Sequence, residues 1–77
     1  MIKIFLDANA MQYRKEIESI LEDRRLYDSD FDGAEFGIFP NSYVTVSHAP
    51  ERGNWAMQSL YNEVKDMIEI CQERKSA

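Results

Sequence analysis

The chain has few of the residues on which special architectures depend. Its 77 residues include one cysteine, one histidine, two prolines and three glycines. A single cysteine excludes an intramolecular disulfide, and with one histidine it cannot complete a zinc site. No apolar run reaches membrane-spanning length, and the run Ile4-Phe5-Leu6 is broken by Asp7, unlike a signal peptide. We therefore expect neither a membrane protein nor an exported one, and the lone thiol favours the cytoplasm.

Basic residues are also scarce. Nine lysines and arginines stand against fourteen aspartates and glutamates, which gives a net charge of -5. Direct nucleic-acid binding usually shows a basic patch, so this balance argues against it and is compatible with a basic protein partner. The hydrophobic fraction of 44% is ordinary for a folded chain. We expect one small domain over residues 1–77, near the lower size limit for a self-sufficient core.

Hydrophobic periodicity predicts the first strand and helix. Residues 1–7 alternate in the manner of a strand, and Phe5 on the second face is typical of a central strand. A helix is predicted over residues 9–25, with Asn9 as the N-cap and Gln12 as its capping-box partner. The apolar stripe of this helix comprises Ala10, Tyr13, Ile17, Ile20 and Leu21.

The second half of the chain predicts two strands and a long helix. Residues 36–39 and 43–47 read as a hairpin around Pro40, with a loop of about three to five residues and Asn41 or Ser42 in a left-handed conformation. The last helix is predicted from an N-cap at Asn54 to about residue 74. Its apolar stripe comprises Met57, Leu60, Tyr61, Val64, Met67, Ile68 and Cys71. Trp55 and Ile70 fall off this stripe, and are either covered by other elements or exposed.

The order β-α-β-β-α predicts an α+β fold, a two-layer sandwich with two helices on one face of a three-stranded sheet. A right-handed crossover through the first helix makes the first two strands parallel. The third strand then lies either between them, as in a ferredoxin-like sheet without its last strand, or outside the second. The pattern leaves both alternatives open.

An acidic segment divides the chain. Residues 27–35 hold four carboxylates and no basic residue, so they account for four of the five excess negative charges. The run from Asp28 to Gly33 matches the first half of a calcium loop, D-x-D-x-D-G. The second half does not match, because Phe39 stands where a bidentate glutamate is required. A solvated acidic turn is the simpler interpretation, and calcium binding is the alternative.

Asp7 is a second candidate for chemistry. The stretch Asp7-Ala8-Asn9 follows a strand and opens a helix, and it resembles the first motif of PIN-domain ribonucleases, in which a strand-end aspartate helps to bind a metal. The same region is similar to the opening of transaldolase-like barrels. Each resemblance covers about ten residues, and a barrel needs roughly 250. Asp7 is the only functional residue that either resemblance implies, and the simpler role for it is helix capping.

The aromatic residues Tyr27 and Phe31, which interleave with the acidic residues, and Trp55, which lies off the helix stripe, favour protein binding over catalysis. Exposed aromatics beside charge are typical of interface anchors, and neither His48 nor Cys71 has a recognisable catalytic partner. The alternative for Tyr27 and Phe31 is that they dock the acidic segment onto the core. The predicted protein-binding residues are Tyr27, Asp28, Asp30, Phe31, Asp32, Glu35 and Trp55.

These features predict a small cytoplasmic regulator or inhibitor of a larger protein with a basic surface, which includes proteins that handle nucleic acid. Inhibitors encoded by viruses and mobile elements have this profile. We expect no catalytic residues, no cofactor, no direct nucleic-acid binding and no membrane association, and a homodimer stays open. The alternative function is a metal-dependent enzyme that uses Asp7, or a calcium module that uses Asp28, Asp30 and Asp32.

Overall fold

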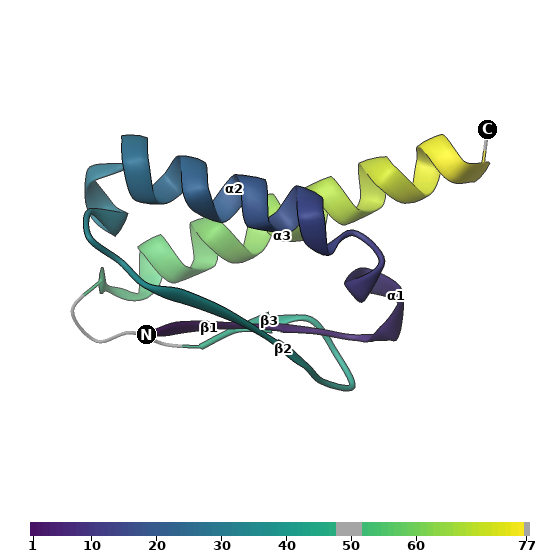
Figure 1. The fold of residues 1–77 in the computed structure, drawn as a ribbon, viewed down its shortest axis with the longest axis horizontal. Coiled ribbons are helices and arrows are strands. Elements are labelled where there is room, and N and C mark those ends of the chain that lie inside the picture. Colours follow the sequence, from purple (N-terminus) through teal and green to yellow (C-terminus); the bar gives the residue numbers. More distant parts are fainter. Residues whose placement is uncertain (48–51, 77) are drawn as a thin grey trace.

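A computed structural model describes residues 1–47 and 52–76, and its elements follow the predicted order. Two main helices form one layer and three strands form the other (Figure 1), which confirms the α+β sandwich. The elements are β1 (Ile2–Leu6), α1 (Ala8–Met11), α2 (Arg14–Tyr27), the 3-10 turn η1 (Ser29–Phe31), β2 (Phe36–Pro40), β3 (Thr45–Val46) and α3 (Asn54–Ser76). Within the described residues, no helix carries an apolar stretch long enough to span a bilayer.

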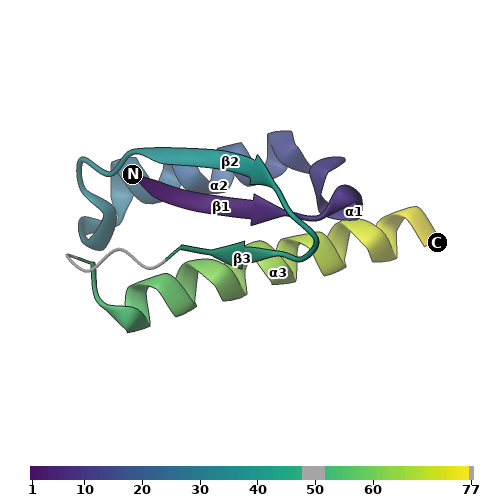
Figure 2. The ribbon, with the colours of Figure 1, turned by 90° about the horizontal axis from the view of Figure 1, so that it is seen from below.

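The first strand is the centre of the sheet. The strand order is β2-β1-β3, with β1 parallel to β2 and antiparallel to β3 (Figure 2). The predicted parallel pair is therefore confirmed. The position of the third strand is neither of the two alternatives, because β3 pairs with the opposite edge of β1. The sheet is thus not a ferredoxin-like sheet without its last strand.

The predicted hairpin is also wrong, because β1 separates β2 from β3. The connecting residues 41–44 pass the end of β1, where the Asn41 N–H donates to the Leu6 carbonyl over 2.8 Å. A turn that crosses a third strand does not need the tight geometry of a hairpin. In agreement, no described non-glycine residue has a positive φ, so neither Asn41 nor Ser42 is left-handed.

The predicted first helix is two helices with a different cap. The Asp7 carboxylate, not Asn9, caps α1: its Oδ1 accepts a hydrogen bond from the Ala10 N–H over 2.7 Å. Asn9 lies inside α1 and accepts a bond from the Gln12 side chain. A break at Tyr13 (φ -103°, ψ 20°) separates α1 from α2, so that α2 can run back over the sheet (Figure 1). The capping role inferred for Asp7 is confirmed.

The core lies between the helices and the inner face of β1. Ile2, Ile4 and Leu6 alternate toward the helices and are buried, as the strand pattern predicts. The predicted stripe of α3 is also confirmed. Its members Met57, Leu60, Val64 and Ile68 are buried, and Tyr61, Met67 and Cys71 pack against them. Trp55 and Ile70, which the sequence left as either covered by other elements or exposed, are exposed.

Candidate protein-binding surface

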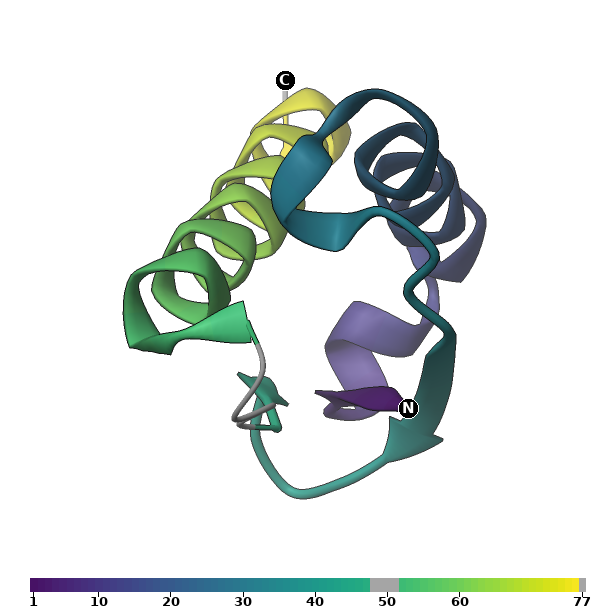
Figure 3. The same cartoon turned by 90° about the vertical axis from the view of Figure 1, so that its left-hand side faces the viewer.

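The acidic segment is anchored by a buried phenylalanine. Phe31 ends η1, is 0% exposed, and its ring centroid lies 6.0 Å from that of Phe36. Figure 3 shows η1 seated between α2 and α3 at one end of the molecule, where it closes the core. Phe31 therefore docks the acidic segment onto the core. This was the alternative to its predicted role as an interface anchor. Its buried ring offers no surface to a partner in this conformation.

Asp28 is a structural residue of this segment. Its Oδ1 accepts the Asp30 N–H over 3.0 Å and so caps η1, and its Oδ2 lies 2.9 Å from Nη1 of Arg24. The acidic segment itself contains no basic residue. Asp28 is nevertheless paired, because its cation comes from α2, four residues earlier in the chain.

Arg24 connects three elements. Besides Asp28, its guanidinium bonds to Glu63 of α3 at 2.7 Å and donates to the Ser59 hydroxyl at 3.3 Å. It also lies 5.6 Å from the centroid of the Phe31 ring. Burial alone would lower the pKa of Arg24, but the bonds and charges of Glu63 and Asp28 outweigh it and raise the pKa above its ordinary value. Arg24 is therefore a fixed cation that joins α2, η1 and α3.

The other three carboxylates of the segment face solvent more freely. Asp32 and Glu35 are exposed and Asp30 is half-buried, and no ion pair joins any of them to a described residue. The Asp32 carbonyl accepts a bond from Arg52 over 3.3 Å, which brings the start of α3 to the segment. These three charges are available to a partner.

Two of the predicted aromatic anchors lie on the surface. Tyr27 is 83% exposed and Trp55 is 66% exposed. Trp55 shares its face of α3 with Ser59, Asp66 and Ile70, because these residues recur at intervals of four, seven and four positions. Tyr27 ends α2 and Trp55 lies in the first turn of α3, and these two helix ends are at the same end of the molecule as η1 (Figure 1).

A groove lies between α2 and α3 on the outer side of the helices. It begins near Tyr27 and continues along α3 to Ile70. It consists of two adjoining hollows of about 670 and 510 Å³, which share Ile20, Arg24 and Glu63. We call it the outer groove. It is defined by Ile20, Asp23 and Tyr27 of α2 together with Glu63, Asp66 and Ile70 of α3.

The outer groove combines apolar side chains with carboxylates. Four carboxylates and one guanidinium line it, and the guanidinium is already paired with two of the carboxylates. The other two, Asp23 and Asp66, have no ion pair with described residues. Ile70 is 49% exposed and lies beside the half-buried Met67 and Ile20. Such a surface suits a partner segment that is both apolar and basic.

Sequence reasoning missed most of this groove. Asp23, Glu63 and Asp66 look like ordinary solvated charges on amphipathic helices. The predicted sandwich places both helices on one face of the sheet, but it does not show which of their residues lie beside each other. The usable signal was the pair Tyr27 and Ile70, two large side chains outside their apolar stripes. Each ends a run of groove residues spaced three or four positions apart.

The described residues do not form a metal site of the kind that the sequence left as an alternative. Among residues 1–47 and 52–76, no three side chains of the ligating types are placed to hold an ion. Both Asp28 oxygens are engaged, and Asp7 caps α1. Cys71 is half-buried, with its sulfur 3.4 Å from that of Met67, and His48 lies outside the described residues.

Comparison with known proteins gives no relative: no protein-family model matches the chain, and no curated protein or solved structure is significantly similar to it. A functional assignment therefore depends on the surface itself.

Proposed function

We propose that this protein is a small protein-binding module that regulates or inhibits a larger protein by occupying a basic surface on it. The contact surface is the outer groove with the adjoining acidic segment. One observation carries the proposal: Tyr27, Trp55 and Ile70 are exposed large side chains, and Tyr27 and Ile70 line the outer groove together with four carboxylates. Large exposed side chains of this kind are the usual anchors of protein interfaces.

The two kinds of side chain have separate tasks in this proposal. The free carboxylates Asp23, Asp66 and Asp32 attract a basic partner and raise the association rate at low ionic strength. The anchors Trp55 and Ile70 lose their water on binding and slow dissociation. Arg24 contributes by holding the walls of the groove in place, since its charge is already neutralised by Glu63 and Asp28.

The proposed partner is a cytoplasmic protein that handles nucleic acid. Proteins of that kind carry basic surfaces, to which an acidic module is complementary. The module itself has no proposed catalytic role, and it acts by covering the partner's surface. The half-buried, single thiol of Cys71 suits a reducing compartment.

Affinity capture with matched variants tests this proposal. The immobilised protein is incubated with lysate of its source cell, beside a variant with Asp23→Lys and Asp66→Lys and a control with Glu18→Gln and Glu69→Gln. The controls are exposed and do not line the outer groove. We expect a protein that the parent and the control retain and that the lysine variant loses.

The captured protein is then purified and its complex is mapped by amide exchange. Protection at Asp23, Tyr27, Glu63 and Ile70 is the expected result. Equal retention by the lysine variant would contradict the proposal, as would protection confined to other faces of the molecule. Glu18, Glu22 and Arg25, on the flank of α2 beside β2, would then be the next residues to test.

A further inference from the structure

The third strand has no described strand along one of its edges. Among residues 1–47 and 52–76, β3 pairs only with β1, with Phe5 opposite Thr45 and Ile4 opposite Val46. The Ser47 N–H donates to the Lys3 carbonyl over 2.8 Å, so Ser47 and Thr45 direct their backbone groups toward β1. Backbone groups alternate along an antiparallel strand, and the N–H and C=O of Val46 therefore point to the opposite, free edge.

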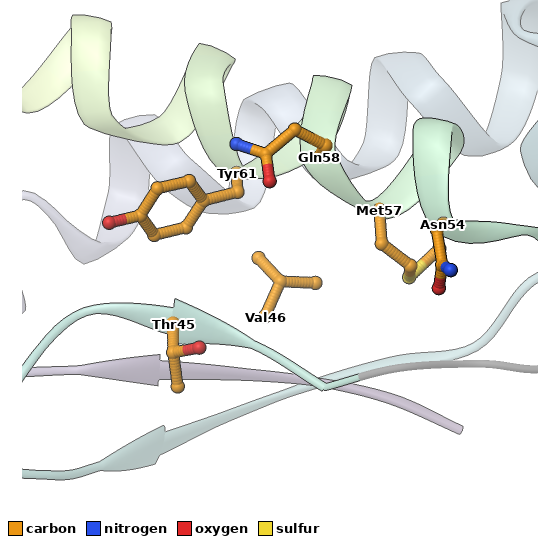
Figure 4. A pocket seen from close by; sticks show the side chains of 6 residues that line it. All are labelled: Thr45, Val46, Asn54, Met57, Gln58 and Tyr61. Atoms are coloured by element: carbon orange, nitrogen blue, oxygen red, sulfur yellow. The ribbon is translucent and has the colours of Figure 1, made fainter.

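A hollow of about 340 Å³ lies beside this free edge, under the first turns of α3. Its lining residues are Thr45 and Val46 of β3 and Asn54, Met57, Gln58 and Tyr61 of α3. Figure 4 shows the Val46 side chain between β3 and α3, whereas the Thr45 side chain points away from α3. We call this hollow the strand-edge groove. None of these six side chains is charged, whereas five charged side chains line the outer groove. A charged group placed here would lose water without gaining a partner, so the groove favours uncharged occupants.

We propose that an extended, uncharged peptide segment of a partner protein adds to β3 as a fourth strand and fills the strand-edge groove. The Val46 N–H and C=O bond to the peptide backbone, and alternate peptide side chains point toward Met57 and Tyr61. The three-stranded sheet ends at β3 while α3 continues beside it, so an added strand covers the flank of α3 that the sheet leaves open (Figure 2).

The other edge of the sheet is less suited to strand addition. β2 ends with Pro40, which has no N–H to offer. The hollow beside β2 is lined by Arg14, Glu18, Glu22 and Arg25, which form two ion pairs. Charged side chains along an edge discourage strand addition. Strand addition is therefore assigned to β3 rather than β2.

This inference is independent of the outer groove. Asn54, Gln58 and Tyr61 lie on the flank of α3 beside β3, and Glu63 and Met67 lie on the flank toward α2. One partner could use both grooves, or two partners could use one each. Failure at one groove leaves the other unaffected.

The test is a titration of isotope-labelled full-length protein, followed by NMR, with a pool of acetylated and amidated hexapeptides built from Val, Thr, Ser and Tyr. We expect shift changes at residues 44–46 and 54–61, and slower exchange of the Val46 amide. A second pool carries N-methyl groups at alternate positions, which removes the donors on one edge. It should bind at least about tenfold more weakly, since each lost backbone bond costs a factor of this order.

Two variants and one control sharpen the result. Val46→Pro removes the free N–H and leaves the bonds to β1, and Gln58→Lys places a charge in the strand-edge groove. Either change should weaken binding of the first pool about tenfold. Ser19→Lys, an exposed position on α2, should leave it unchanged. If Val46→Pro fails to fold, Gln58→Lys alone decides. Absence of shifts with the first pool, shifts at β2 or the outer groove instead, or equal binding of the methylated pool would each overturn the proposal.

Discussion

Nε of Arg24 lies 2.7 Å from Oε1 of Glu63, across the contact between α2 and α3. The same guanidinium bonds to Asp28, and its side chain is only 18% exposed. Arg24 of α2 therefore bonds both to α3, through Glu63, and to the N-cap of η1, through Asp28. These contacts lie where the outer groove meets the acidic segment. The stability of the fold and the shape of the proposed binding surface both depend on these contacts.

Replacing Arg24 with alanine should destabilise the protein. The change leaves Glu63 and Asp28 without their cation and uncovers the Phe31 ring. We expect a loss of about 1–3 kcal/mol in the free energy of unfolding, with partial exposure of the pair to solvent limiting the effect. Chemical denaturation measures this loss. Arg25→Ala is the matched control, because its pair with Glu22 is exposed, and it should barely change the midpoint. Equal effects of both substitutions would contradict the role of Arg24.

Three of the four carboxylates of the acidic segment should separate into one that stabilises the fold and two that do not. Asp28→Ala removes the cap of η1 and one Arg24 contact, and should cost about 1–2 kcal/mol. Asp30→Asn combined with Asp32→Asn should leave the melting temperature equal or slightly higher, because it removes like charges that have no ion pair with described residues. Thermal unfolding followed by circular dichroism compares the two. A stabilising Asp28→Ala would show that repulsion dominates here after all.

Asp7 should matter more to stability than Asn9. Asp7→Ala removes the cap of α1 and should cost about 1 kcal/mol, whereas Asp7→Asn should preserve most of the stability. Asn9 is exposed, so Asn9→Ala should change the free energy of unfolding by less than about 0.5 kcal/mol. Urea titrations of the three variants give the comparison. The reverse order would mean that Asn9 is the cap.

A charge at Val64 should unfold the domain, and the same charge at Ile70 should not. Val64 is 0% exposed, and an unpaired buried charge costs several kcal/mol against a total stability of roughly 4–8. Ile70 lies on the same helix at 49% exposure, so Ile70→Asp should melt close to the parent. Far-ultraviolet circular dichroism distinguishes the two variants. A native melt for Val64→Asp would mean that α3 faces the other way.

The elements with strong periodicity could be predicted from the sequence. Alternation in residues 1–7 and the stripe of Leu60, Val64 and Ile68 reflect burial on one side of a regular element, which is a local property. The cap at Asp7 was identified only as a secondary possibility, because Asn9 also satisfies the local rule. The break at Tyr13 has no local signal of the glycine or proline type.

Most of the features that could not be predicted depend on distant contacts. The Tyr43–Ser47 composition indicates a strand but not which edge of β1 it joins. The partners of Asp28, by contrast, are local, and they were missed because the first helix was predicted to end at residue 25. α2 continues to Tyr27, which places Arg24 one helical turn before Asp28. The outer groove exists because α2 and α3 lie side by side, and no short stretch of either helix contains it.

Association kinetics with the captured partner test the central claim most directly. The association rate is measured at several salt concentrations for the parent, for Asp23→Asn combined with Asp66→Asn, and for Trp55→Ala. The account predicts that the first variant associates more slowly and with a weaker salt dependence, because steering charges are lost. Trp55→Ala should associate at the parent rate and dissociate faster. Parent rates and parent salt dependence in both variants would contradict the claim that the outer groove and Trp55 form the binding surface.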